Sequence, residues 1–220
     1  MSNGPRTLKT DDLIEMLAAA QRRRPRGVPW VAVAASLAAG LAAALLLMAA
    51  TLGIRPDLIA SLADPVVWLK LGCSALVLLA AGAAATRLSL PGKGWSGAGL
   101  ILLLAFAVVA CWALVDLAGR PAAEWAPCIA GRDWLTCLVA IPLLALPAML
   151  AMSLAMRRLA PTRLDLAGTL MGLASGGAAA FAFTFYCQDD AAPFVAVFYG
   201  IALAMSALLG RALGPKLLRW

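Results

Sequence analysis

The chain has 220 residues, of which 63% are apolar and 13% are charged, and its formal net charge is +7. This composition leaves little sequence for a soluble domain. We interpret the positive charge as a topology signal and as attraction to anionic lipid, so the sequence predicts no direct contact with nucleic acid.

A helix is predicted in the tail that precedes the first apolar run, within residues 1–29. Acidic residues follow the capping residue Thr10, and the basic residues Arg22–Arg24 close the helix before Pro25. Negative charge near the start of a helix and positive charge near its end complement the helix dipole. The tail is therefore predicted to contain a short, capped helix.

This helix carries one apolar stripe. Leu13, Met16, Leu17 and Ala20 follow the i, i+3, i+4, i+7 spacing and share a face, with Ile14 beside them. Lipid, the protein's own inner loops and a groove in a soluble partner are the three candidates that can cover the stripe. We favour a soluble partner, because an anionic leaflet repels the three carboxylates of the helix.

Six long apolar runs follow the tail. Each has about 20 residues or more, the length that spans a hydrocarbon core of ~30 Å, and lipid requires such runs to be helical. The sequence therefore predicts an all-α polytopic membrane protein, with a short cytoplasmic N-terminal helix in residues 1–29 and a six-transmembrane-helix bundle in residues 30–220. The runs are Trp30–Gly53, Val66–Arg87, Ser96–Ala118, Trp134–Met156, Leu166–Cys187 and Pro193–Leu213.

Basic residues are divided unequally between the two sides of these runs. Of the 18 Lys and Arg residues, all except Arg55, Lys70, Arg120 and Arg132 fall on the side of the two termini. The positive-inside rule then predicts that both termini are cytoplasmic.

The interiors of the runs are expected to contain no ionisable group. Lys70 lies about one turn from the outer end of the second run, where its side chain can snorkel to the interface, and Asp116 lies at the outer end of the third run. Intramembrane charges usually mark ion or proton pathways, so this absence argues against coupled transport.

Glycines recur at every fourth position of the fifth run, at Gly168, Gly172 and Gly176. Such a pattern forms a groove that lets another helix approach closely. We expect this helix to belong to the same chain, and a homodimer contact is the alternative.

The five cysteines fall into two groups. Cys73 and Cys111 lie within runs and are interpreted as small apolar fillers. Cys128, Cys137 and Cys187 lie at or near the outer face, where a bacterial periplasm permits disulfides.

Cys137 opens the fourth run and Cys187 closes the fifth, so their depths in the membrane nearly match. Neighbouring antiparallel helices can bring the two Cα atoms within the ~7 Å that a disulfide requires, with Cys128 as a competing partner. A permanent disulfide, two unpaired thiols and a pair that opens, closes or binds a thiophilic ligand all remain open. Asp189 and Asp190 are expected to raise the thiol pKa, which argues against redox catalysis.

The order and spacing of short segments along nearly the whole chain resemble the NrsF family of bacterial membrane anti-sigma factors. The resemblance implies a negative regulator of an extracytoplasmic-function sigma factor in the bacterial inner membrane, whose tail holds sigma and whose periplasmic cysteines sense stress. The segments are Lys9–Ile14, Arg24–Pro29, Cys137–Leu138, Arg158–Pro161, Tyr186–Asp190, Phe198–Tyr199 and Leu218–Trp220.

The resemblance assigns sensing to Cys137 and Cys187. The predicted sigma-binding residues combine the family segment with the apolar stripe, and they are Thr10, Asp11, Asp12, Leu13, Ile14, Met16 and Leu17.

The main hypothesis is thus a regulatory binding protein, not an enzyme, with a sigma factor and membrane lipid as partners. The chain contains neither His nor a C-x-x-C motif, so we predict no metal site and no cofactor. A membrane thiol-disulfide oxidoreductase that uses the cysteines with a quinone is the first alternative, and a small-solute permease is the second. The oxidoreductase is disfavoured because no buried cationic group is expected near the cysteines.

Overall fold

A computed structural model describes residue 10, residues 15–16, 29–89 and 97–157, residues 159 and 161, and residues 163–218. These residues form helices joined by short connections and contain no strand, which confirms the all-α prediction. The helices are α2 (Pro29–Thr51), α3 (Leu58–Ser61), α4 (Pro65–Leu88), α5 (Ala98–Ala118), η1 (Ala122–Glu124), α6 (Trp125–Ala130), α7 (Trp134–Arg157), α8 (Leu164–Phe183), α9 (Ala192–Phe194), the π-helical turn η2 (Val195–Tyr199) and α10 (Gly200–Leu217).

In the described part of the chain, six helical segments are long and apolar enough to cross a membrane, as predicted. They match the six runs to within a few residues, except that the fourth includes η1 and α6 ahead of α7. The boundaries follow local signals: Asp64 caps α4 by accepting a hydrogen bond from the Val66 backbone N–H at 2.8 Å, and Pro65 occupies the first helical position.

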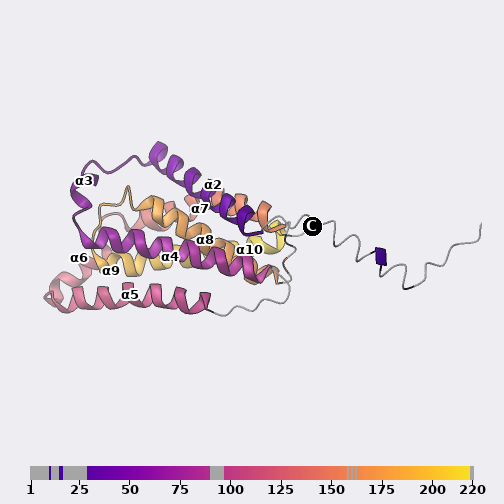
Figure 1. Ribbon diagram of the computed structural model, residues 1–220. Coiled ribbons are helices and arrows are strands. Elements are labelled where there is room, and N and C mark those ends of the chain that lie inside the picture. Colours follow the sequence, from indigo (N-terminus) through magenta and orange to yellow (C-terminus); the bar gives the residue numbers. More distant parts are fainter. Residues whose placement is uncertain are drawn as a thin grey trace, which may run out of the picture.

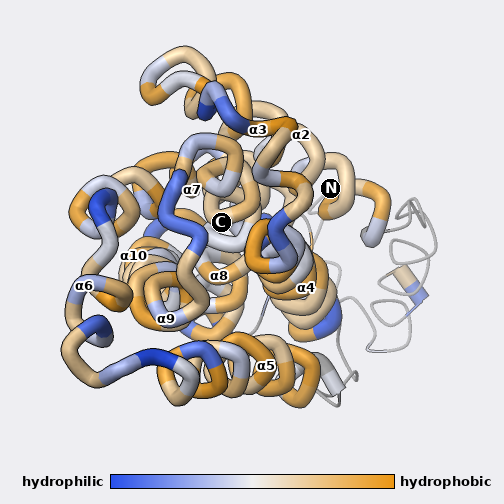
Figure 2. Tube along the Cα trace, turned by 90° about the vertical axis from the view of Figure 1, so that its left-hand side faces the viewer, coloured by the Kyte–Doolittle hydropathy of each residue, from blue (hydrophilic) through white to orange (hydrophobic). Residues whose placement is uncertain are grey.

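The outward faces of these helices are apolar. Large side chains such as Leu46, Leu103 and Val115 are between 65% and 74% exposed, and Figure 2 shows apolar residues around the outside of the bundle as well as inside it. Water would penalise so much exposed apolar surface, whereas hydrocarbon does not. The six helices therefore indicate a membrane protein.

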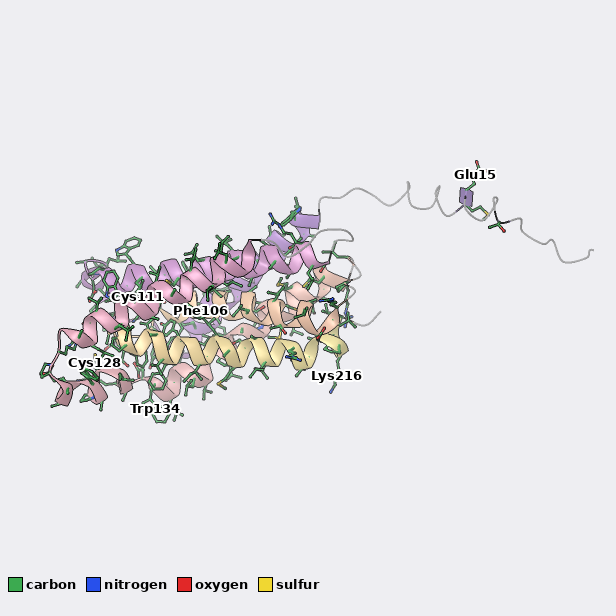
Figure 3. All side chains as sticks on the ribbon, turned by 90° about the horizontal axis from the view of Figure 1, so that it is seen from below. Glu15, Phe106, Cys111, Cys128, Trp134 and Lys216 are labelled. Atoms are coloured by element: carbon green, nitrogen blue, oxygen red, sulfur yellow. The ribbon has the colours of Figure 1, made fainter. Side chains whose placement is uncertain are left out.

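The bundle has two distinct ends (Figure 1). The loop end contains residues 52–64, 119–133 and 184–191, together with the short helices α3, α6 and α9. The tail end lies opposite and contains the start of α2 and the end of α10. Figure 3 shows Cys128 and Trp134 toward the loop end and Lys216 at the tail end.

Helix α8 lies at the centre of the bundle and packs against α10, α4, α7 and α2 (Figure 2). A Cβ atom added at Gly172 would collide with the Ser206 carbonyl oxygen, and one added at Gly168 would lie 2.8 Å from the Gly214 Cα atom. The glycine groove is therefore filled by α10 of the same chain, which confirms the intramolecular alternative. A homodimer remains a prediction, but this groove is not free to form it.

Candidate functional site

The two predicted sensing cysteines both lie at the loop end of the bundle, although they belong to different elements. Cys137 occupies the first turn of α7, where its backbone N–H donates to the Asp133 carbonyl at 2.8 Å. Cys187 follows the last turn of α8. Both side chains are fully buried in one apolar cluster, and the two thiols lie close enough to interact electrostatically.

All five cysteines are free thiols. Cys128 lies on α6, where its electrostatic neighbours are Arg120, Asp116 and Glu124. The structure thus groups Cys137 with Cys187 and places Cys128 in a separate charged environment.

Lys70 makes the closest charged contact with these thiols. Its ammonium lies 3.8 Å from the Cys187 Sγ atom, and it donates to the Asp189 carbonyl at 2.6 Å and to the Asp190 carboxylate at 2.7 Å. The side chain is 0% exposed. Two predictions were therefore wrong: Lys70 does not snorkel to the interface, and a buried cation does lie next to a cysteine.

The burial of Lys70 has a physical reason. An ammonium taken out of water is tolerated when an opposite charge and hydrogen-bond acceptors surround it. Asp190 and the Asp189 carbonyl supply both, and they come from a loop that is distant in sequence. The argument against coupled transport from ion-free interiors consequently does not hold at this position.

Arg55 joins the same group from the segment between α2 and α3. Its guanidinium donates to Asp57 at 2.9 and 3.0 Å, to Asp190 at 2.8 and 3.3 Å, and to the Cys187 carbonyl at 3.0 Å. Its backbone N–H donates to the Phe185 carbonyl at 3.0 Å. Arg55 is only 5% exposed. We call Arg55, Asp57, Lys70 and Asp190 the charge cluster.

The ion pair between Arg55 and Asp57 shifts the pKa values of both groups. The hydrogen bond to Asp57 raises the pKa of the Arg55 guanidinium, and the same bond lowers the pKa of the Asp57 carboxyl. The Asp190 carboxylate is shared between two cations, because it accepts from both Arg55 and Lys70.

The Asp189 carboxylate has different hydrogen-bond partners from the Asp190 carboxylate. One of its carboxylate oxygens accepts hydrogen bonds from the backbone N–H groups of Arg132 and Asp133 at 2.9 and 2.8 Å. Gly131 precedes them with a φ of +58°, and an added Cβ atom there would lie 2.7 Å from the Asp189 carboxylate. Asp189 thereby ties the Cys187 loop to the connection that leads into α7.

Burial raises the pKa of the Cys187 thiol, and the nearby Lys70 ammonium opposes this rise. The predicted rise of the Cys187 pKa is therefore correct, but its main cause is burial and not the charge of Asp189 and Asp190. The Asp189 charge adds to the rise of this pKa, whereas the Asp190 carboxylate is paired with Lys70 and Arg55. The thiol is protonated at neutral pH and is a weak nucleophile.

Aromatic residues close the site on its inner side. The Tyr199 hydroxyl lies 3.5 Å from the Thr184 hydroxyl and also contacts Cys187. The ring centroids of Tyr199 and Phe183 are 6.1 Å apart. An apolar cavity of about 200 Å³ between α4, α5 and α10 reaches Lys70 and Tyr199. In the part of the chain that is described, no three His, Cys, Asp or Glu side chains converge as metal ligands.

The predicted sigma-binding segment is described at three positions. Thr10, Glu15 and Met16 are helical and exposed, and Met16 is 61% exposed. Figure 3 shows Glu15 clear of the six long helices. The remaining predicted residues lie outside the described residues, and they are Asp11, Asp12, Leu13, Ile14 and Leu17.

Sequence reasoning missed the charge cluster. A Lys within an apolar run is a signal by itself, because intramembrane charges are costly and are usually paired. The partners carried no such signal, because Lys70 and Asp190 are 120 residues apart.

Fold and site together define a helical protein with six helices, among its described residues, that are long and apolar enough to cross a membrane, and with Cys137 and Cys187 thiols that are enclosed beside a buried ion-pair cluster. The family model described as "Negative regulator of sigma F" (NrsF) matches residues 17–220, and the chain belongs to this family. The family consists of regulatory anti-sigma factors, which confirms the predicted family and the prediction of a non-enzyme and removes support from the oxidoreductase alternative.

Two relatives have similar lengths. The chain is 36% identical over 218 residues to the probable anti-sigma-F factor NrsF of Azospira oryzae and 37% identical over 218 residues to the anti-sigma-F factor NrsF of Caulobacter vibrioides. Each alignment covers 97% of this chain and 100% of the relative. No solved structure matches the chain.

Proposed function

We propose that this protein is a membrane-anchored anti-sigma factor that holds an extracytoplasmic-function sigma factor through its N-terminal segment. It releases the sigma factor when Cys137 and Cys187 change their bonding state in the periplasm. The observation that carries the proposal is membership of the NrsF family over nearly the whole chain. The start of α2, which follows the N-terminal segment in the sequence, and the loop that carries Cys187 lie at opposite ends of the bundle, and this arrangement supports the proposal (Figure 1).

The proposal places the tail end in the cytoplasm of a bacterial inner membrane. Arg87, Arg157 and Lys216 lie in the last turns of α4, α7 and α10, and all three helices end there. Basic residues that flank spans on one side favour the cytoplasm for that side. Arg157 also donates a hydrogen bond to the Leu217 carbonyl, which holds two of these helix ends together.

The N-terminal helix binds sigma through its apolar stripe. Burying three side chains of the size of Leu13, Met16 and Leu17 contributes roughly 4–8 kcal/mol before ordering costs. Met16 is exposed, so this side chain of the stripe is accessible to a partner. Binding in a groove of a soluble partner is a common use of such a helix.

The test is capture of a candidate sigma factor from the same genome by the full-length protein in lipid nanodiscs. Leu13→Asp and Leu17→Asp put a charge into the stripe, and each is expected to weaken binding by about 100-fold, equivalent to about 3 kcal/mol. Ala18→Asp adds the same charge on another face of the predicted helix and serves as the matched control. Equal capture by the control and the two stripe variants would refute the proposal.

A further inference from the structure

The charge cluster fastens the far end of α2 to the loop that carries Cys187. Arg55 follows the end of α2 by four residues, and its backbone N–H donates to the Phe185 carbonyl. Its guanidinium donates to the Cys187 carbonyl and to Asp190. Hydrogen bonds from Arg55 therefore connect the segment after α2 to the loop that carries Cys187.

Lys70 makes the corresponding connection from α4. Its ammonium bonds to Asp189 and Asp190 and contacts the Cys187 sulfur. The loop is thus held from two spans, and both attachments meet at Asp190. A movement of the Cys187 backbone changes these bonds directly, because Arg55 donates to the Cys187 carbonyl itself.

Helix α2 is suited to transmit a movement of the Cys187 loop from the loop end to the tail end of the bundle. It has 23 residues, and at 1.5 Å per residue it extends about 34 Å from the loop end to Pro29, where the N-terminal segment ends. It is lightly held, because 22% of its span is buried, compared with 78% for α8. Its contact with α7 is formed by small residues, Gly40 against Ala148. Packed helices with smooth contacts shift by sliding, typically by about 1–2 Å.

We propose that Arg55 and Lys70 are positioning residues that hold the Cys187 loop, and that Arg55 passes a change in the bonding of Cys187 into α2 and along it to the N-terminal segment. This inference rests on the proposed function and adds the residues that connect its two sites. Coupling between two distant sites requires contacts that differ between the two states of the protein, and the bonds of Arg55 and Lys70 to the Cys187 loop are such contacts.

Disulfide formation is a defined trigger for this mechanism. A two-electron oxidant such as the azo compound diamide accepts two electrons and two protons and becomes the hydrazine. The two S–H bonds of Cys137 and Cys187 break, and one S–S bond forms. Because the two sulfur atoms must then lie about 2.05 Å apart, Cys187 moves toward Cys137, and the carbonyl that Arg55 holds moves with it.

The test measures the position of α2 without a sigma factor. Spin labels are attached through unnatural ketone amino acids at Val31 on α2 and Leu103 on α5, so that the thiols stay free. Both residues are exposed, and their helices lie on opposite sides of the bundle (Figure 2). Electron–electron resonance in nanodiscs then gives the distance before and after diamide, and mass spectrometry verifies the Cys137–Cys187 disulfide. In the wild type, the mean distance is expected to shift by about 1–2 Å.

Arg55→Met is expected to form the disulfide but to lose the shift. Arg55→Lys keeps the positive charge but loses the planar set of N–H donors of the guanidinium, so its shift in distance is expected to be smaller than that of the wild type. This variant takes the place of Arg55→Met if Arg55→Met does not fold. Arg120→Met is the matched control, because it breaks the exposed Arg120–Asp116 ion pair at the same end, and it is expected to shift like the wild type.

Two results would overturn the inference: a wild-type disulfide that leaves the distance unchanged, or Arg55 variants that shift as far as the wild type. Sigma capture is a separate experiment. If stripe variants keep sigma while the Arg55-dependent shift is present, the proposed function fails and the mechanical connection stands.

Discussion

Replacing Asp190 by Asn removes the carboxylate that the two buried cations of the charge cluster share. Lys70 and Arg55 have side-chain exposures of 0% and 3%. Removing one partner of a buried ion pair typically costs about 3–5 kcal/mol, because the remaining charge is left uncompensated. Arg55 keeps Asp57, and Lys70 keeps the Asp189 carbonyl, so we expect a loss of about 3 kcal/mol in the free energy of unfolding.

A second substitution tests the origin of this loss. Lys70→Met removes the unpaired ammonium while the Met side chain fills the space of the lysine stem. In the Asp190→Asn background it is expected to restore about 2 kcal/mol, so the two substitutions are strongly non-additive. The assay is reversible unfolding in mixed micelles by titration with dodecyl sulfate, followed by tryptophan fluorescence.

Asp116→Asn is the matched control for a surface ion pair. Asp116 pairs with Arg120, which is 41% exposed, and the expected cost is much smaller than that of Asp190→Asn, because water screens an exposed ion pair. If Asp190→Asn costs no more than this control, or if the double variant shows the sum of the two single losses, the cluster is not an obligatory buried ion pair and the reasoning is refuted.

Two further predictions concern packing and thiol reactivity. Gly172→Ala is expected to destabilise the bundle by about 1–3 kcal/mol, because the new methyl group meets α10; Gly200→Ala, with open space around it, is expected to be neutral or slightly stabilising in the same unfolding assay. Since the pKa of Cys187 is raised, its alkylation by iodoacetamide is expected to be slow at pH 7.5 and to accelerate about tenfold per pH unit above that. Lys70→Met removes the charge that lowers this pKa and is expected to slow alkylation at every pH; a rate that does not depend on pH would contradict the assignment.

The elements were predictable because their causes are local. A run such as Leu166–Cys187 is apolar, and in hydrocarbon its backbone groups can bond only within the same helix. Structure and prediction differ mainly at helix ends: α8 stops at Phe183, and the next residues form the loop that carries Cys187. The glycine groove was also predictable, because Gly168 and Gly172 repeat at a helical spacing that serves close packing.

The candidate site was predictable only in part. Cys137 and Cys187 were paired by their depth in adjacent spans, and the structure brings them into one buried cluster. Lys70 was assigned to the interface, because a lysine one turn from the end of a span can reach water. Burial wins here because Asp190 and two further acceptors meet the ammonium inside the protein.

By itself, the sequence determined the class of protein, the positions of its spans and the family, since apolar length, charge distribution and segment order are all written along the chain. Only the tertiary structure decided which polar groups meet. Arg55 and Cys187 are 132 residues apart, and neither carries local information about the other. They become partners because the central helix α8 returns the chain to the loop end, where a buried charge is stable only beside its opposite.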